Sequence, residues 1–285
     1  MNVFGMVTTR HSNTYTDHAL RSLIANTKLG PDDQVVLIDN DGSYPGLPEE
    51  VRDRIRLYVN PSPRGFAANL NQAMDIARVH EADLAFLNND MIFSPGWFEP
   101  LQEPGPFVLS PLSNVEVQHE RKSLKCTYEM DLGDYLGKER LLVELVREHR
   151  KRARGHVKVI SFPFFAVRIP FQVYSVVGSL DETFGVGGGE DKDYSIRSYL
   201  AGFELRYMLS SYVLHFQGKS TWHGAETADE TAARDKVYTK RFREKWGERA
   251  YDLLVMQAED KLPVDLQQAY KGGDFRPVIE ALLSR

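Results

Sequence analysis

The residues best suited to chemistry in this chain are acidic and amide side chains that follow apolar runs. Asn88-Asn89-Asp90 follows the apolar run 82–87. A lone carboxylate, completed by substrate phosphates and water, commonly holds Mg²⁺ or Mn²⁺ in proteins. Asp90 is therefore a candidate metal ligand. The alternative is an ordinary turn or helix cap, because Asn and Asp often occupy such positions.

A second acidic position, Asp39, ends the apolar run 34–38 and is followed by Asn40. A carboxylate at a strand end can accept hydrogen bonds from a nucleobase or from ribose hydroxyls, as it does in dinucleotide-binding folds. The alternative is a turn that Asp39 closes with its own side chain and no ligand. Spacing alone does not separate the two interpretations.

The segment 60–69 contains Arg64 and Gly65 just before a predicted helix. A glycine permits close backbone approach, a helix N-terminus offers free N–H groups, and the arginine adds a positive charge. Together these features could receive a phosphate. Proline-containing loops and glycines are also common before helices, so this motif is weak on its own.

Three glycines at 187–189 precede Glu190, Asp191 and Asp193. A carboxylate here could accept the proton of an attacking hydroxyl group. The alternative is that acidic residues favour helix N-termini for electrostatic reasons. The consecutive glycines predict either close backbone approach to a ligand or a mobile loop. Further on, His215 ends an apolar run and becomes a metal candidate only if it lies near Asp90.

The elements that must position these residues alternate between strand-like and helix-like segments in the first ninety residues. This order predicts a mostly parallel α/β sheet with helices on both faces, whose strand C-termini meet along one ligand-binding edge. The tract 161–180 is interpreted as buried strands, because Arg168, Pro163 and Pro170 argue against a membrane span. The expected strands are 3–9, 34–40, 55–59, 82–87 and 205–215, and the expected helices 15–26, 67–79, 141–154 and 191–202, with a helical tail over 231–285.

The composition is that of an ordinary globular protein. The 285 residues are 42% hydrophobic and 26% charged, which excludes fibrous and largely disordered chains. The net charge of −5 argues against a protein that is basic all over. The single cysteine, Cys126, excludes an internal disulfide framework and favours the cytoplasm. No secretory signal and no transmembrane segment are expected.

The segment 115–158 is strongly charged and is expected to be an insert. Its end is densely basic, with six Lys and Arg residues against Glu148 over 147–158. One interpretation is a surface for an anionic acceptor, such as a charged glycan, a phospholipid-linked group or a nucleic acid. A solvated helical face is equally compatible with the pattern. The apolar side of the helix, with Leu141, Leu142 and Leu145, leaves peripheral contact with a membrane open.

Taken in order, these motifs resemble the family 2-type glycosyltransferases of the GT-A fold, over roughly residues 3–110 and 160–222. The resemblance implies a nucleotide-diphosphate sugar donor, preferably a UDP-sugar, and Mn²⁺ or Mg²⁺ bound by Asp90 and His215. It implies Asp191 as catalytic base, with Glu190 contacting the sugar or acceptor, and inversion by single displacement at the anomeric carbon. The residues that would hold the nucleotide are Thr8, Asp39, Asn40, Arg64, Gly65, Asn69 and Asn89.

The sequence departs from the Asp-x-Asp metal motif of that family at Asn88, so only Asp90 of this motif can bind a metal as a carboxylate. The expected division is a nucleotide-sugar-binding half (1–114), the insert (115–158), an acceptor and catalytic half (159–230) and a helical C-terminal extension (231–285). One rival is a nucleotidyltransferase, but Arg10-His11-Ser12 stands where its glycine-rich first loop would be. The other is a non-catalytic sugar-nucleotide or nucleic-acid binding module, against which the set of Asp90, Asp191 and His215 argues.

Overall fold

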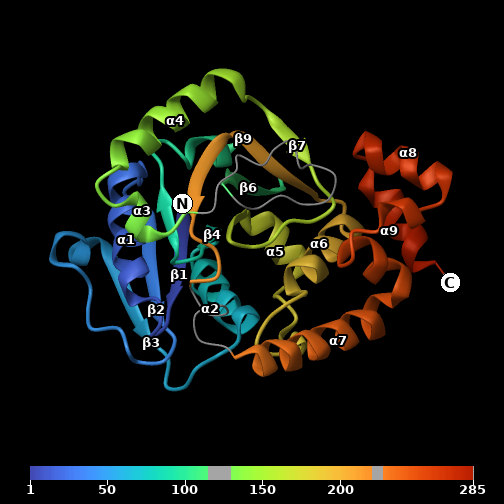
Figure 1. Cartoon of the computed structure of the whole chain (residues 1–285), viewed down its shortest axis with the longest axis horizontal. Coiled ribbons are helices and arrows are strands. Elements are labelled where there is room, and N and C mark those ends of the chain that lie inside the picture. Colours follow the sequence, from blue (N-terminus) through green and yellow to red (C-terminus); the bar gives the residue numbers. More distant parts are fainter. Residues whose placement is uncertain (115–129, 220–226, 285) are drawn as a thin grey trace.

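The computed structural model describes residues 1–114, 130–219 and 227–284 (Figure 1). The first part of the predicted insert, 115–129, lies outside the described residues, and Cys126 with it. A nine-stranded sheet runs through the molecule in the order β3-β2-β1-β4-β8-β6-β9-β5, and β7 pairs with β9. The sheet and its helices carry every candidate site residue.

The N-terminal half is a parallel sheet, as predicted. β1 pairs with β2 and β4, and β2 pairs with β3, all in parallel. The pairing sets Thr8 opposite Asp39 at the C-terminal edge. The elements are β1 (Asn2–Thr8), α1 (Asn13–Asn26), β2 (Gln34–Asp39), a 3₁₀ helix (Glu49–Arg54), β3 (Ile55–Val59), α2 (Phe66–Val79) and β4 (Asp83–Leu87).

Close packing between α2 and the sheet explains a glycine in the middle of β1. A Cβ atom at Gly5 would lie 2.7 Å from Cβ of Ala73 on α2, which is closer than such atoms approach. α2 accordingly buries one apolar face, including Leu70, Met74 and Ala77, against β1 and β4. This helix begins at the loop that carries Arg64 and Gly65, so its packing fixes that loop at the edge of the sheet.

The second half of the sheet mixes directions. β8 is antiparallel to both β4 and β6, whereas β9 runs parallel to β6 and antiparallel to β5 and β7. The elements are β5 (Met91–Phe93), a 3₁₀ helix (Glu99–Gln102), β6 (Phe107–Ser113), β7 (His156–Lys158), β8 (Ala166–Ile169), a 3₁₀ helix η4 (Glu182–Phe184), α6 (Glu190–Leu200) and β9 (Glu204–His215).

The interpretation of 161–180 as buried strands holds only for β8 and is wrong for the rest of the tract. Only β8 is a strand, and α5 (Phe171–Val177) follows it as a helix. Pro170 lacks the N–H group that a strand ladder would use, and it precedes the first helical residue. The Phe171 N–H then donates to Oδ1 of Asp83 at 2.8 Å, which satisfies one of the free donors at the helix start.

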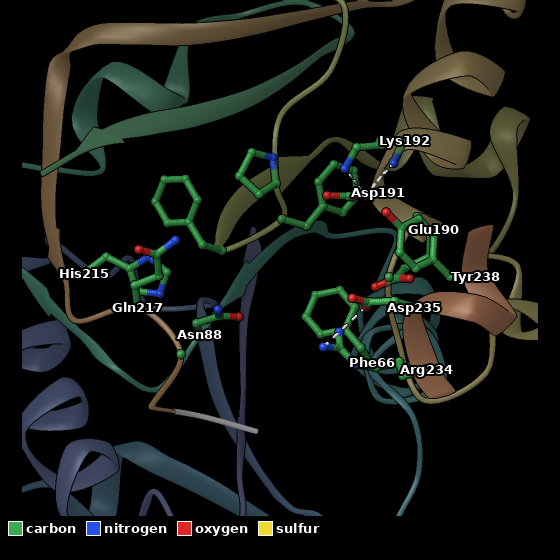
Figure 2. Close-up of a pocket in the computed structure, with 16 residues that line it drawn as sticks. Phe66, Asn88, Glu190, Asp191, Lys192, His215, Gln217, Arg234, Asp235 and Tyr238 are labelled. Atoms are coloured by element: carbon green, nitrogen blue, oxygen red, sulfur yellow. Dashed lines mark hydrogen bonds and ion pairs between the residues drawn. The ribbon is translucent and has the colours of Figure 1, made fainter. Parts of the chain in front are cut away.

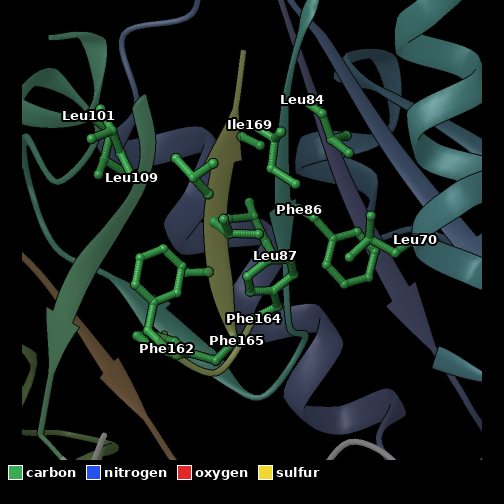
Figure 3. Close-up of a cluster of buried hydrophobic side chains, with 14 of the residues drawn as sticks. Leu70, Leu84, Phe86, Leu87, Leu101, Leu109, Phe162, Phe164, Phe165 and Ile169 are labelled. Atoms are coloured by element: carbon green, nitrogen blue, oxygen red, sulfur yellow. The ribbon is translucent and has the colours of Figure 1, made fainter. Parts of the chain in front are cut away.

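One hydrophobic core spans both halves of the sheet (Figure 3). Side chains of β4 and β8 meet those of α2, β6 and the segment 162–165 there. The labelled members are Leu70, Leu84, Phe86, Leu87, Leu101, Leu109, Phe162, Phe164, Phe165 and Ile169. Phe164 and Phe165 are buried in this core, and the segment 163–165 also lines the cleft described below.

The C-terminal helices, coloured orange to red in Figure 1, lie together beside α6. They are α7 (Ala228–Leu254, with a break at Gly247, where φ is 84°), α8 (Val264–Gly272) and α9 (Phe275–Leu283). On α7, Tyr251, Leu253 and Leu254 are buried, and Trp246 is half-buried. These side chains belong to the same core as the sheet.

The helix predicted over 141–154 is present as α4 (Glu139–Arg152), preceded by the short α3 (Leu132–Tyr135). α4 buries Leu142 and Val146 and packs against β9. Across the described parts of the chain, no helix is both long and apolar enough to cross a membrane.

Candidate functional site

Asp90 and His215, far apart in the sequence, are brought together by the pairing of β5 with β9. Met91 lies opposite His215 in this ladder, so Asp90 comes next to the end of β9. Nε2 of His215 is 3.2 Å from Oδ1 of Asp90, and both residues are buried. The other Asp90 oxygen accepts the backbone N–H of Lys219 at 2.9 Å. The condition under which His215 becomes a metal candidate is met.

The surroundings of His215 fix its ring. The ring stacks on that of Phe165, with centroids 5.2 Å apart and planes 15° from parallel. Its backbone N–H donates to Oδ1 of Asn114 at 2.7 Å. Burial disfavours the charged form of Asp90, but His215 and the Lys219 N–H outweigh that effect and lower the pKa of Asp90. A carboxylate is therefore kept ionised beside an imidazole.

This pair fits a divalent cation as a partial ligand set. Carboxylate and imidazole are both accepted by Mn²⁺. Within the described residues, no group of three or more His, Cys, Asp and Glu side chains is placed to hold a metal. Two protein ligands suffice where substrate phosphates and water complete the shell, as is usual for Mg²⁺.

A cleft of about 370 Å³ separates His215 from a second group of side chains (Figure 2). Asp90 is fully buried and is not among the residues that line this cleft. His215, Asn88 and Gln217 line one wall, and the acidic start of α6 with the first turns of α7 lines the other. The cleft is also lined by Phe66, which lies beside Asp235 in Figure 2, and by Pro163, Phe164 and Phe165. The structure thus brings Asn88, Glu190, Asp191 and His215 to one cavity, as the order of the motifs predicts.

Glu190 lies in the acidic wall and is almost completely buried. Burial, reinforced by the neighbouring charge of Asp191, raises the pKa of Glu190 to about 7. Its Oε2 atom has no hydrogen-bond partner among the described residues. An unpartnered acceptor facing a cleft is suited to a donor group that arrives with a ligand.

Asp191 differs from Glu190 in its partners. One carboxylate oxygen accepts the backbone N–H of Lys192 at 2.7 Å, and the ammonium of Lys192 lies 3.5 Å from the same oxygen. Both side chains line the cleft. Asp193 points away from it into the joint between α6 and α7, where it contacts Arg197, Lys245 and Trp246.

The glycine run is explained by protein packing. Gly187, Gly188 and Gly189 all have positive φ values, of 153°, 112° and 85°. Cβ atoms at Gly188 and Gly189 would lie 3.1 and 3.0 Å from ring carbons of Tyr238 on α7. The predicted close approach is therefore made by an aromatic ring of the chain itself. It sets this ring directly beside Glu190, as Figure 2 shows.

The loop before α2 is clamped by three buried asparagines. Oδ1 of Asn40 accepts the backbone N–H of Arg64 at 2.9 Å, and the Arg64 carbonyl accepts the side-chain amides of Asn40 and Asn69. Asn60 donates to both Asn40 and Asn69 and so completes the network. Asn40 and Asn69 thus hold the loop backbone, and the Arg64 side chain is exposed.

Gly65 connects this loop to the acidic segment. A Cβ atom there would lie 2.6 Å from the Gly185 carbonyl oxygen, and the next residue, Phe66, donates its backbone N–H to the Val186 carbonyl at 2.9 Å. The close approach predicted for a phosphate is thus made here by the backbone that leads to Glu190.

The remaining predicted nucleotide-binding residues are buried in hydrogen-bonded turns. Asp39 accepts backbone N–H groups of Asp41, Ser43 and Tyr44, the arrangement of the turn alternative. Thr8 contacts the hydroxyl of Thr16 at 2.7 Å. Asn89 donates to Ser12 and Thr16, while its Oδ1 has no partner within the described residues.

The sequence reasoning missed the contribution of α7 to the cleft. Arg234, Asp235 and Tyr238 all line it. The spacing of Arg234 and Tyr238, four residues apart, places them on one helix face. The only available signal was this spacing, since nothing in a tail helix tells which distant loop it covers.

Several basic side chains at the end of α4 are engaged in contacts within the chain. His149 contacts the Leu209 carbonyl at 2.7 Å, and Arg150 donates to the carbonyls of Ser210 and Pro95. Lys151 pairs with Glu148, and Lys158 with Glu204. Several cations of the run therefore bind backbone or carboxylate groups of the chain itself.

Comparison with known proteins identifies a family that part of the chain matches. Residues 6–104, which include Asp90, match the model of glycosyl transferase family 2. No curated protein sequence matches the chain. The family resemblance predicted from the motifs is confirmed for this segment.

Solved structures share the fold over nearly the whole chain. GalNAc-T7 with UDP, GalNAc and Mn²⁺ aligns with a TM-score of 0.62 at 16% identity, over 99% of this chain and 57% of the other. TarS 1–349 of S. aureus with UDP-GlcNAc gives 0.51 at 12% identity, over 99% and 87%. The mannosyltransferase PcManGT of Pyrobaculum calidifontis with GDP-Man and Mn²⁺ gives 0.50 at 12%, over 98% and 86%.

These likenesses confirm the predicted GT-A fold. This chain spans little more than half the length of GalNAc-T7.

Proposed function

We propose that the protein is an inverting, metal-dependent glycosyltransferase that moves a sugar from a nucleotide-diphosphate donor to an acceptor hydroxyl. The observation that carries the proposal is the cleft itself. It sets the Asp90–His215 pair opposite the Glu190–Asp191 pair, on a chain whose residues 6–104 match glycosyl transferase family 2. Related folds have been solved with UDP-GlcNAc or GDP-Man, which supports a sugar nucleotide as donor.

The roles follow from position. Asp90 and His215 would hold Mn²⁺ or Mg²⁺, which when bound neutralises charge on the donor diphosphate. Asp191 takes the proton of the acceptor hydroxyl as that oxygen attacks the anomeric carbon and the nucleoside diphosphate leaves. Glu190 contacts the sugar or the acceptor. Arg64 offers its charge to the diphosphate from a loop that Asn40 and Asn69 keep in place.

The remaining predicted binding residues support the nucleotide side of the site. Asp39 and Asn89 shape the turns after β2 and β4, and Thr8 braces the end of β1. Gly65 lets the Arg64 loop approach the acidic segment. The division into a nucleotide-sugar half (1–114), an insert (115–158), an acceptor half (159–230) and a C-terminal extension (231–285) is part of this proposal, as is a cytoplasmic location.

The test is hydrolysis and transfer across a panel of UDP-, GDP- and dTDP-sugars, with Mn²⁺, Mg²⁺ or EDTA. We expect release of a nucleoside diphosphate that requires the metal. Absence of both turnover and binding for every donor would refute the proposal. Formation of pyrophosphate from a nucleoside triphosphate and a sugar phosphate would favour the nucleotidyltransferase instead.

A substitution of Asp191 tests its assignment as the catalytic base. We expect Asp191→Asn to lower kcat about 10²- to 10⁴-fold, the usual contribution of general base catalysis, and to leave the donor KM nearly unchanged. Asp265→Asn, on α8, changes the same side chain outside the cleft and is the matched control. Full activity of the Asp191→Asn variant would show that Asp191 is not the catalytic base.

A further inference from the structure

The first turns of α7 form one wall of the cleft and lie outside the segment that matches glycosyl transferase family 2. Arg234, Asp235 and Tyr238 reach the cavity from this helix, opposite His215 and Gln217. This wall therefore lies outside the proposed nucleotide-sugar half of the chain.

The wall is held rigidly. The Tyr238 ring lies against the backbone of Gly188 and Gly189, where no side chain intervenes. Further along α7, Lys245 and Trp246 both contact the buried carboxylate of Asp193, at 2.6 and 2.9 Å. Arg241 and Lys245 also pair with Asp181, next to η4. A wall fixed at several points can impose a defined orientation on a ligand.

Each cation of the wall is paired with a carboxylate. Arg234 lies 3.6 Å from Asp235, and Lys192 lies 3.5 Å from Asp191. Glu190 is a third carboxylate, and no third cation lines this wall among the described residues. An anionic acceptor would meet no surplus positive charge here and would face Glu190, which disfavours it.

The same surfaces suit a neutral ligand rich in hydroxyl groups. Tyr238, Phe164 and Phe66 supply aromatic surface for the apolar face of a sugar ring. The unpartnered Oε2 of Glu190 and the exposed carboxylate of Asp235 can accept hydrogen bonds from hydroxyl groups.

We propose that this face of α7, with Glu190, is the acceptor subsite and that it binds a neutral sugar unit, with Tyr238 as its platform and Asp235 as a specificity-determining residue. The inference rests on the proposed function and names the acceptor class. It also separates acceptor binding from the basic end of α4, where His149 and Arg150 are engaged with backbone carbonyls.

The first test is binding, because it does not require turnover. Saturation-transfer NMR is recorded with methyl glycosides of glucose, galactose, mannose, GlcNAc and GalNAc, and with the corresponding sugar 6-phosphates. Each sample contains a nucleoside diphosphate and no Mn²⁺. We expect a neutral glycoside to bind and Asp235→Asn to weaken it about tenfold, the effect of losing one hydrogen bond to a charged group. Binding of none of the neutral sugars, or preference for the phosphates, would overturn the inference.

The second test is kinetic. For Asp235→Asn we expect the ratio of acceptor KM to donor KM to rise about tenfold. Tyr238→Phe should keep most of the platform, whereas Tyr238→Ala should lose it, and circular dichroism shows whether each variant is folded. Lys240→Ala, an exposed position further along α7, is the control and should leave the ratio unchanged.

The outcomes distinguish this inference from the proposed function. If the wild-type protein hydrolyses a sugar nucleotide but the Asp235 variant has the wild-type ratio, the acceptor subsite lies elsewhere. If a glycoside binds in an Asp235-dependent manner but no donor is ever hydrolysed, the transferase proposal fails while the sugar-binding wall stands.

Discussion

At the scale of single residues, two adjacent carboxylates illustrate how position decides chemistry. Glu190 is enclosed and has an unpartnered oxygen, whereas Asp191 lies beside the Lys192 ammonium. The raised pKa of Glu190, about 7, makes it exchange its proton near neutral pH. Neighbouring acids in unlike environments are a common basis for dividing acid, base and binding roles.

The raised pKa of Glu190 predicts a pH-dependent stability. In the unfolded chain this carboxyl loses its proton near its ordinary value of 4.5, but in the folded protein it does so near 7. Between these values the folded state holds a proton that the unfolded state has released, so stability falls as pH rises. We expect Glu190→Gln to remove this loss and to gain roughly 2–3 kcal/mol relative to wild type between pH 4.5 and 8.

Urea unfolding of both proteins at pH 4.5, 6 and 8 measures this difference. The exposed Glu244→Gln variant on α7 controls for the change of side-chain type. Parallel stability curves for wild type and Glu190→Gln would show that Glu190 is not held in an unfavourable charged state.

At the residue scale, the sequence predicted the position of a side chain correctly where that residue lies directly at the end of a strand or the start of a helix. His215 and the Glu190–Asp191 pair meet at one cleft, and Asp90 contacts His215, because each directly follows or precedes a recognisable element. It was less informative for Asp39 and the glycines at 187–189. Their partners are Tyr44 and the ring of Tyr238, and only the folded chain brings that ring to the glycines.

At the scale of elements, the joint between α6 and α7 decides whether the cleft has its second wall. Asp193 is fully buried and contacts Arg197, Lys245 and Trp246. A buried carboxylate with three donors is stable only as long as all of them remain in place. The joint was not predictable, because the residues of α7 that form it lie about fifty positions further along the chain.

Removal of that carboxylate should detach the helix. We expect Asp193→Ala to destabilise the protein by about 3–5 kcal/mol, because it leaves Arg197 and Lys245 without their shared partner. Hydrogen exchange should increase in α7 before the sheet is affected. Arg276→Ala removes an exposed ion pair with Glu280 on α9 and should change stability by less than about 0.5 kcal/mol. Equal effects of the two variants would contradict a special role for the joint.

Periodicity located β1, β2, β3, β4 and β9 and the helices α1, α2, α4 and α6, since buried strands and amphipathic helices leave a local pattern. It did not predict β5, β6 or β7. It failed at 171–177, where a helix follows Pro170. A short apolar run fits a buried strand or a buried helix equally well. The hydrogen bond from Phe171 to Asp83, which supports the helix, involves a residue far away in the sequence.

At the scale of the whole molecule, the C-terminal helices share the core of the sheet. Phe242, Tyr251, Leu254 and Ile279 are buried in the same cluster as the strands. The tail is thus part of the folded unit on which the cleft depends, although it lies outside the family 2 segment.

Removal of the C-terminal helices tests whether they belong to the same folded unit as the sheet. We expect a chain that ends at Thr227 to aggregate or to lose cooperative unfolding, because the surface buried by α7 and α9 becomes exposed. Size-exclusion chromatography and thermal unfolding compare it with the full chain, which should unfold in one transition. A monodisperse truncated chain with an unchanged Tm would show that the tail is an independent appendage.

The contact between Gly65 and Gly185, with the hydrogen bond from Phe66 to Val186, links the two substrate sides of the cleft through backbone atoms. A donor that pulls on the Arg64 loop must also move the segment that carries Glu190. Thermodynamic linkage then requires that each substrate alter the affinity of the other by the same factor. Binding of the donor and binding of the acceptor would therefore be coupled, whichever of the two binds first.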